Sequence, residues 1–580
     1  MSKIHKIWGA ATGYLSQSRR MWVDFVLLAG FVGVVFGLFG VAREWSLPKD
    51  APVKVDFDLS PSLLPYYTLL TLTRGLIGYV LSIIFTLTYG YWAAKDHVAE
   101  RLLVPMLDIL QSIPILGFMP GLILAMVALF PSNRVGLELA AIITIFTGQA
   151  WNMTFSYYHS LRSIPENLNE AATLYNFTWW ERLKWLELPI STIGLVWNSM
   201  MSMAGGWFFI MISEQFPGNT LPGLGSYMSE AVTQNNGRAQ VLAIIAMMLM
   251  IIALDQLLWR PLVVWSQKFR LDDAGQSEAA ESWFLDFLRR SRILAFLENI
   301  FLKPSANARP RPAPKSAEPQ KATRGGQVVS TLLFVVLLSV LVWGGIQLFR
   351  VLRANDLPTW GRLFSVALVT LGRVMASTAI ATLIALPLGL KIGLSPKLSR
   401  MLQPIVQIVA SFPAPMLFPM VLVLMARCGV EIDFGSILLM LLGTMWYIVF
   451  NVVAGAMAIP SDIREAAESY NITGWQRFVK IYFPGVFPYL VTGWVTAAGG
   501  AWNTSIVAEY IDADHKAKFG LGAEISDAFA KSTLGDSAAA ANLSRLAAAV
   551  VVMSLVVVMF NRFVWKRLYH LAETRYSLSR

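Results

Sequence analysis

The chain has 580 residues, of which 56% are hydrophobic and only 14% are charged. Soluble domains average about 25% charged residues, so this composition excludes an ordinary soluble protein and indicates an integral membrane protein. The formal net charge is +11, but the basic residues lie in loops between apolar runs. That placement is typical of cytoplasmic membrane loops and not of nucleic-acid binding. The single cysteine, Cys428, excludes an internal disulfide and a cysteine-built metal site.

Apolar runs of about 20 residues, the length that crosses a bilayer, recur along the chain. Residues 1–21 are basic and are expected to be cytoplasmic. We expect six spans within 22–266 and six within 328–580, at about 22–42, 66–94, 104–130, 135–157, 190–213 and 240–264, and at about 328–349, 363–393, 402–426, 434–457, 484–508 and 546–566. Six is an even number, so both halves have one orientation. The sequence predicts an all-α integral membrane protein with about 12 transmembrane helices in two parallel six-span repeats, with both termini cytoplasmic.

The segment 267–327 between the halves differs in kind. Ser282–Lys303 has apolar positions at helical spacing and a basic face, which favours a helix lying on the lipids of the inner leaflet. A Pro-rich basic linker follows. We interpret the segment as a tether with a surface helix, in preference to a regulatory module.

A polar segment occurs twice in the sequence. EAATLYNFTWWERLKWLELP runs from Glu170 to Pro189, and EAAESYNITGWQRFVKIYFP runs from Glu465 to Pro484 without a gap between the aligned copies. The repeat extends to paired positions elsewhere, which are Arg74 and Arg373, Gly90 and Gly389, Pro114 and Pro413, Glu138 and Asp433, Trp207 and Trp502, and Glu214 and Glu509. A tandem duplication explains this set.

Each copy reads as a helix, a turn and a second helix; we call residues 163–189 and 458–484 the first and second EAA loops. Ser163 to Glu166 has capping-box spacing, and so do Thr178-x-x-Glu181 and Thr473-x-x-Gln476. The first helix should stop near Asn176 and Asn471, because asparagine tolerates the left-handed conformation. The second should end at Pro189 and Pro484. By alternation of spans, both loops face the cytoplasm, where a rigid helix can dock into a partner's groove.

The loops resemble the EAA motif of inner-membrane permeases of binding-protein-dependent ABC importers, written EAA, three residues, Gly, nine residues, Ile, one residue, Leu-Pro. The glycine position is Asn in both copies, and the terminal pair is Leu188-Pro189 in the first copy and Phe483-Pro484 in the second. The resemblance implies a type I ABC-importer permease fold in a bacterial inner membrane. It implies two ATPase subunits docked on Glu170, Ala171, Ala172 and Asn176, and on Glu465, Ala466, Ala467 and Asn471.

The fused, duplicated form resembles the permeases of nitrate, sulfonate, taurine and bicarbonate importers. Ser213-Glu214 and Ala508-Glu509, each followed by Gly-Leu-Gly, are similar to a stretch of those proteins. This resemblance implies a small anion as substrate and an extracytoplasmic substrate-binding protein as a further partner.

The chain contains no G-x-x-x-x-G-K-[ST] loop, so it cannot hold ATP phosphates in the known way. We therefore expect a transport subunit that is not an enzyme and binds no cofactor, with ATP and Mg on the separate ATPases. The five histidines and one cysteine form no visible catalytic cluster in the sequence.

Candidate path residues lie within the spans. Arg74 and Arg373 lie at a depth where a charge is costly. Each either attracts an anion, or else pairs with Glu214 or Glu509 or snorkels to the outer interface, and the second reading is favoured. Breaks at Pro114 and Pro413 would bring Ser112 and Ser411 toward the axis. Further candidates, which could equally serve helix packing, are Asn198, Ser202, Trp207, Trp502 and Asn503.

Two other functions stay open. Within ABC importers, the substrate could be a metal ion, thiamine or a polyamine. From another class, an ion-coupled secondary transporter also has duplicated six-span halves, but it gives no reason for paired helix–turn–helix loops.

Overall fold

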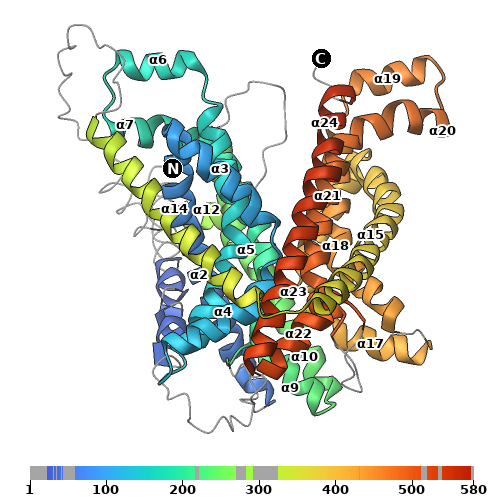
Figure 1. Cartoon of the computed structure of the whole chain (residues 1–580). Helices are drawn as coiled ribbons and strands as arrows, with labels where there is room; N and C mark the ends of the chain where they lie inside the picture. Colours follow the sequence, from blue (N-terminus) through green and yellow to red (C-terminus); the bar gives the residue numbers. More distant parts are fainter. Residues whose placement is uncertain are drawn as a thin grey trace, which may run out of the picture.

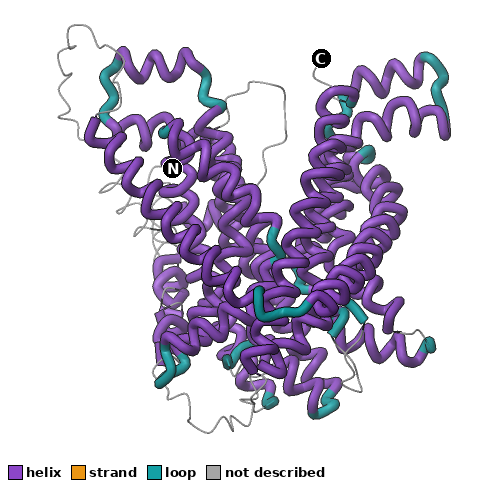
Figure 2. Tube along the Cα trace, in the orientation of Figure 1, coloured by secondary structure: helices purple, strands orange, loops and turns teal. Residues whose placement is uncertain are grey.

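The computed structural model describes residues 23–43 apart from 31, 34 and 41, and residues 59–215, 221–269, 282–289, 291, 324–429, 432–510, 519–532 and 539–576. Within these residues the regular structure is helical throughout (Figure 2). The helices of the two halves lie together at one end of the molecule and diverge toward the end that carries α6 and α19 (Figure 1). We call the latter the loop end.

The first half follows the predicted order. After a helix at Val23–Gly40, its elements are η1 (Pro61–Leu63), α2 (Leu64–Lys95), α3 (His97–Ser112), α4 (Ile115–Leu129), α5 (Val135–Arg162), α6 (Glu166–Leu174), α7 (Trp179–Arg182), the π turn η2 (Leu183–Glu187), α8 (Leu188–Gln215), α9 (Leu224–Thr233), α10 (Gly237–Leu254), the π turn η3 (Asp255–Trp259), α11 (Arg260–Ser266) and η4 (Gln267–Phe269).

The second half repeats this order. Its elements are α14 (Arg324–Leu352), α15 (Leu357–Gly393), α16 (Pro396–Ser411), η5 (Ala414–Met416), α17 (Phe418–Arg427), α18 (Ile432–Met457), α19 (Ser461–Ser469), α20 (Gly474–Arg477), the π turn η6 (Phe478–Tyr482), α21 (Phe483–Ala508), α22 (Leu521–Ser532), α23 (Ala539–Phe560), the π turn η7 (Asn561–Trp565) and α24 (Lys566–Arg575). Of the predicted surface helix Ser282–Lys303, only α12 (Trp283–Arg289) and two single residues beside it are described; the rest lies outside the described residues.

When helices are judged by length and composition alone, fewer of them qualify as membrane passages than the twelve predicted. Within the described residues, eight helices are long and apolar enough to cross, and the bent α3–α4 pair makes up to nine. The other three predicted passages are α5, α21 and the α16–α17 pair. Helices α5 and α21 pack between neighbouring helices, where they carry small and polar residues in place of the apolar surface that lipid requires.

The third passage of each half is broken, as predicted. Helices α3 and α4 meet at an angle of 97°, with Ile113 and Pro114 extended between them. In the second half, Phe412 and Pro413 are extended between α16 and η5. Proline has no N–H to continue a helix and disfavours helical geometry in the residue before it. The break turns α4 away from the direction of α3 (Figure 1).

The same three helices form the centre of each half. Helix α5 packs between α2 and α8, and α18 packs between α15 and α21. Glycines allow the close approach: a Cβ on Gly90 would overlap the Tyr157 ring, and one on Gly389 would overlap Val452. A buried apolar cluster joins the halves, because it contains Leu116 and Met119 of α4 together with residues of α21, α22 and α23. The duplicated chain therefore forms one packed body.

Candidate functional site

Both EAA loops lie at the same end of the molecule, as Figure 1 shows for α6 and α19. Alternation of the helices predicted this arrangement. In each loop a nine-residue helix, α6 or α19, is followed by a four-residue helix, α7 or α20. The first and second helices run as two arms joined by a short turn (Figure 2).

The turn between the arms has the same geometry in both copies. Asn176 has φ 51° and Asn471 has φ 50°. In the first copy the N–H of Phe177 donates to the Ala172 carbonyl oxygen at 3.0 Å, and the N–H of Asn176 donates to Thr173 at 3.0 Å. The second copy repeats both bonds, from residues 472 and 471. This pattern is a Schellman motif with asparagine in the left-handed position, so the predicted helix end is confirmed in both loops.

Replacing Asn176 by alanine is expected to cost about 1 kcal/mol locally, because a Cβ without a polar group is disfavoured at positive φ. Glycine at the same position should be tolerated. Limited proteolysis of the loop would show it: the alanine variant should be cut faster than the glycine variant. Equal rates for the two variants would contradict this account of the turn.

Of the three predicted capping boxes, only the one at Thr178 forms. The Thr178 hydroxyl accepts from the Glu181 N–H, and the Glu181 carboxylate accepts from the Thr178 N–H. Ser163 makes no box, because Pro165 is extended and becomes the N-cap of α6 itself. Thr473 makes no side-chain cap either. Both short helices begin at equivalent positions, but Gly474 stands at φ 54° where the first copy has Trp179, so the backbone at the helix start differs.

The prediction that the second helix ends at Pro189 and Pro484 is wrong. Helices α7 and α8 continue into one another through the π turn Leu183–Glu187, and α20 and α21 do so through Phe478–Tyr482. A proline ring clashes with the carbonyl one turn before it. The wider π turn just ahead of each proline accommodates that ring without ending the helix.

The residues of the EAA motif divide into exposed and buried positions. Glu170, Glu465 and Ala466 are exposed, and Ala171 is partly exposed. Ala172 and Ala467 are 5% and 2% exposed and point into their own chain; Ala172 packs in a cluster with Tyr157, Leu161 and Leu186. The second alanine thus supports the loop. Sequence reasoning missed the large exposed side chains beside the turns, which are Leu174, Tyr175, Trp180, Tyr470 and Trp475.

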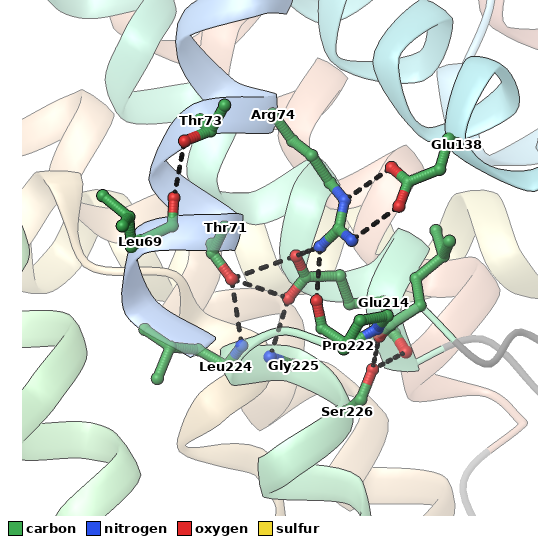
Figure 3. Close-up of polar contacts among 11 residues, drawn as sticks. Leu69, Thr71, Thr73, Arg74, Glu138, Glu214, Pro222, Leu224, Gly225 and Ser226 are labelled. Atoms are coloured by element: carbon green, nitrogen blue, oxygen red, sulfur yellow. Dashed lines mark hydrogen bonds and ion pairs between the residues drawn. The ribbon is translucent and has the colours of Figure 1, made fainter. Parts of the chain in front are cut away.

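Arg74 lies in a buried ion cluster, drawn in Figure 3. Its Nε and Nη2 donate to the two carboxylate oxygens of Glu138 on α5, both at 2.7 Å. Its Nη1 donates to Glu214 of α8 at 2.8 Å and to the Pro222 carbonyl at 2.7 Å. All three charged side chains are 0% exposed. The guanidinium therefore has no surface on which a solute could bind.

The Glu214 carboxylate also holds the chain that leads into α9. It accepts from the Thr71 hydroxyl at 3.0 Å and from the Gly225 N–H at 2.9 Å, and the Leu224 N–H donates to Thr71 at 2.9 Å. One acid thus ties α2, α8 and α9 together. Pro222, just before α9, lies beside the same cluster (Figure 3).

The second half repeats the arrangement. Arg373 Nη1 donates to Glu509 at 3.0 Å and to the Phe519 carbonyl at 2.7 Å. Glu509 accepts from Thr370 and from the Gly522 N–H at 2.8 Å. The pairing of each arginine with its acid, the favoured alternative of the sequence analysis, is confirmed by these contacts. The Arg74 guanidinium is enclosed by its partners, whereas the anion-attracting role of Arg373, whose side chain is 10% exposed, stays a prediction.

Gly223 and Gly520 are expected to tolerate no side chain. A Cβ on Gly223 would overlap the Glu214 carboxylate, and one on Gly520 would overlap the Glu509 carboxylate. Alanine at either position should therefore push the acid off its arginine and lower thermal stability in detergent. Gly121, where a Cβ would meet nothing within 4 Å, is the control, and its alanine variant should melt like the parent protein.

The remaining path candidates are placed in different surroundings. Trp207 and Trp502 are 3% and 2% exposed and belong to the packed core. The Ser202 side chain is buried. Ser112 accepts from Asn561 at 3.0 Å, and Asn503 accepts from the Leu116 N–H at 3.1 Å, so both lie where the halves meet. Ser411 lines a small cavity at that boundary with Asp255 and Gln407.

Asn198 lines a larger cavity of about 370 Å³ between α3, α5 and α8. Sequence reasoning missed its other lining residues, which are Asp108, Gln111, Asn152, Phe155, Ser156 and His159. Polar residues at 108, 111, 152, 156 and 159 follow helical spacing in α3 and α5, which was the available signal. The cavity borders the second half, because Lys566 Nζ lies 2.9 Å from Asp108 Oδ2.

A family model described as the inner membrane component of binding-protein-dependent transport systems matches residues 86–258 and again residues 381–568. The two matches cover more than half of the chain, and each contains one EAA loop. The protein belongs to this family of membrane-spanning transport subunits, and it carries the family's domain twice.

Curated relatives are similar over parts of the chain. The glycine betaine transport system permease protein OpuAB of Bacillus subtilis is 25% identical over 187 residues, 32% of this chain and 62% of the relative. The nitrate import permease protein NrtB of a Synechocystis strain is 26% identical over 134 residues, 23% and 44% of the two chains. The bicarbonate transport system permease protein CmpB of Synechococcus elongatus is 26% identical over 206 residues, 36% and 69%. The chain thus spans less than two thirds of the length of the first two.

Proposed function

We propose that this chain is the complete membrane-spanning pair of an ATP-driven importer, in which one fused polypeptide replaces two permease subunits. The observation that carries the proposal is the matched pair of EAA loops. Both present an exposed glutamate and a Schellman turn at the same end of the molecule. We infer that this end is cytoplasmic and that each loop docks one ATPase subunit, which binds ATP and Mg.

The docking surface follows from exposure. Glu170 and Glu465 supply the charge, and the turn supplies apolar side chains: Tyr175 and Tyr470 are 78% and 81% exposed, and Trp180 and Trp475 are 69% and 75% exposed. Exposed aromatic side chains at one place are typical of interface centres. Asn176 and Asn471 set the angle of the turn, while Ala172 and Ala467 support it from beneath.

For the substrate we propose a small anion of the nitrate, sulfonate or bicarbonate class. The similarity to nitrate and bicarbonate permeases supports it. The cavity between α3, α5 and α8 offers hydrogen-bond donors, namely the side chains of Gln111, Asn152, Ser156, His159 and Asn198, and its one carboxylate, Asp108, is paired with Lys566. Glycine betaine, a zwitterion, is the second candidate, because permeases for it are similar over comparable lengths. An extracytoplasmic binding protein would deliver either solute.

Uptake by the assembled complex in proteoliposomes tests the proposal. ATP-dependent accumulation of labelled nitrate, bicarbonate or a sulfonate, competed by the other anions, is the expected result. Accumulation of glycine betaine alone would contradict the anion class. Uptake driven by an ion gradient without any ATPase would contradict the whole proposal and favour a secondary transporter.

A further inference from the structure

The first EAA loop is tied to α2 by two polar contacts. Glu187, at the end of the π turn η2, is 0% exposed, and its Oε1 lies 2.6 Å from Lys95 Nζ at the end of α2. Trp179 Nε1 of α7 donates to the Tyr91 hydroxyl oxygen of α2 at 2.7 Å. Tyr91 and Lys95 are four residues apart and lie on one face of α2. We call Tyr91, Lys95, Trp179 and Glu187 the polar strap.

The buried carboxylate gives the strap its strength and its direction. A buried charge is costly unless an opposite charge accompanies it. Arg182 Nε lies 3.4 Å from the same Glu187 oxygen, and Arg182 also donates to Asn169 of α6 at 2.6 Å. Glu187 therefore connects the end of α2 to both arms of the loop, since Asn169 lies on α6 and Arg182 ends α7.

The second repeat contains none of the four strap residues. Its equivalent positions are Leu390, Leu394, Gly474 and Tyr482. The equivalence holds in space as well as in sequence, because Gly90 packs on Tyr157 just as Gly389 packs on Val452. The second loop instead packs through Phe478, Ile481 and Tyr482 against a buried apolar cluster. The Arg477 guanidinium lies over the Tyr482 ring at 5.4 Å.

We propose that Glu187 is a positioning residue that fastens the first EAA loop to α2, so that the two EAA loops are mechanically unequal. The first loop moves with α2 as one body. The ion pair and the hydrogen bond from Trp179 to the Tyr91 hydroxyl fix the orientation of the loop as well as its distance from α2. The second loop is joined to its helices by apolar packing, which is non-directional and permits small sliding movements. This inference rests on the proposed function, since it assigns unequal parts to two loops that dock ATPases.

The sharpest variant copies the second repeat into the first, by Lys95→Leu together with Glu187→Tyr. The second half folds with these residues at the same places. Arg182 loses its acid but keeps its bond to Asn169, and its side chain is 34% exposed, so the exchange leaves no fully buried charge unpaired. Two measurements are made on the full chain. Amide hydrogen exchange of residues 166–182 needs no ATPase, and the ratio of solute transported to ATP hydrolysed is measured in the reconstituted complex.

The expected results are exchange in the first loop about tenfold faster and a transport-to-hydrolysis ratio at least about threefold lower, with ATPase binding retained. Tyr482→Phe, at the equivalent position of the second repeat, is the matched control and should change neither quantity. Unchanged exchange in the double variant, or an unchanged ratio despite faster exchange, would overturn the proposal. The absence of ATP-dependent uptake by the unsubstituted protein would overturn the proposed function instead, and the exchange measurement would still decide whether the strap holds the loop.

Discussion

Replacing Arg74 by glutamine is expected to destabilise the protein by about 3–5 kcal/mol, the cost of removing one partner of a buried ion pair. Glu138 and Glu214 would both remain buried, with no cation between them. The backbone around Pro222 would also lose its donor. We expect the melting temperature of the detergent-solubilised protein to fall by about 3–4 °C, measured as the temperature at which half of the protein elutes as a monodisperse species.

Two further variants separate lost charge balance from lost packing. Combining Arg74→Gln with Glu138→Gln and Glu214→Gln removes all three charges, and it should recover a substantial part of the stability, because no unpaired ion is left buried. Lys566→Gln breaks an ion pair with Asp108 whose side chains are 58% and 34% exposed. That change should cost less than about 1 kcal/mol. If Arg74→Gln were as stable as Lys566→Gln, the structural role of the cluster would be refuted.

Reversing the charge of both loop glutamates, with Glu170→Lys and Glu465→Lys, is expected to abolish ATPase docking. Both side chains are exposed, so the substitutions should leave folding intact. A reversed charge at an interface adds repulsion to the loss of an attractive contact, and we expect uptake to fall by more than about tenfold. Co-purification of tagged ATPase with the membrane protein measures docking directly.

The control for this experiment is Glu230→Lys. Glu230 is a partly exposed acid on α9, and α9 lies at the opposite end of the molecule from α6 (Figure 1). This variant should still co-purify with the ATPase, and any change in its uptake should come from steps at the end of the molecule that carries α9. Normal transport by the Glu170→Lys and Glu465→Lys double variant would refute the docking assignment.

Features set by local chemistry could be predicted from the sequence. The turn at Asn176 and Asn471 needs only a residue that tolerates positive φ at the end of a short helix. The breaks before Pro114 and Pro413 follow from the missing N–H of proline. One of the two acidic partners of Arg74, Glu214, could be predicted from the repeat. The other, Glu138, could have been recognised as a second acid within a span that must be neutralised there.

Features set by packing between distant segments could not be predicted. Whether Ala172 faces a partner or its own chain depends on where Tyr157 and Leu186 lie. The π turns arise from how a helix accommodates Pro189 while it packs against its neighbours, and no sequence period marks them. Helices α5 and α21 carry more polar residues than a helix that faces lipid can carry. Their surfaces are buried among other helices, and this burial is not visible in the sequence.

The contacts across the boundary between the halves have become complementary. Gln407 Nε2 donates to Asp255 at 3.0 Å, whereas Asp108, which occupies the position of Gln407 in the first repeat, faces Lys566 at 2.9 Å. The boundary therefore differs on its two sides: at Gln407 an amide meets an acid, whereas at Asp108 an acid meets a cation. Equivalent positions of the two repeats carry different side chains, so the fused chain is in effect a covalently linked heterodimer of its own halves.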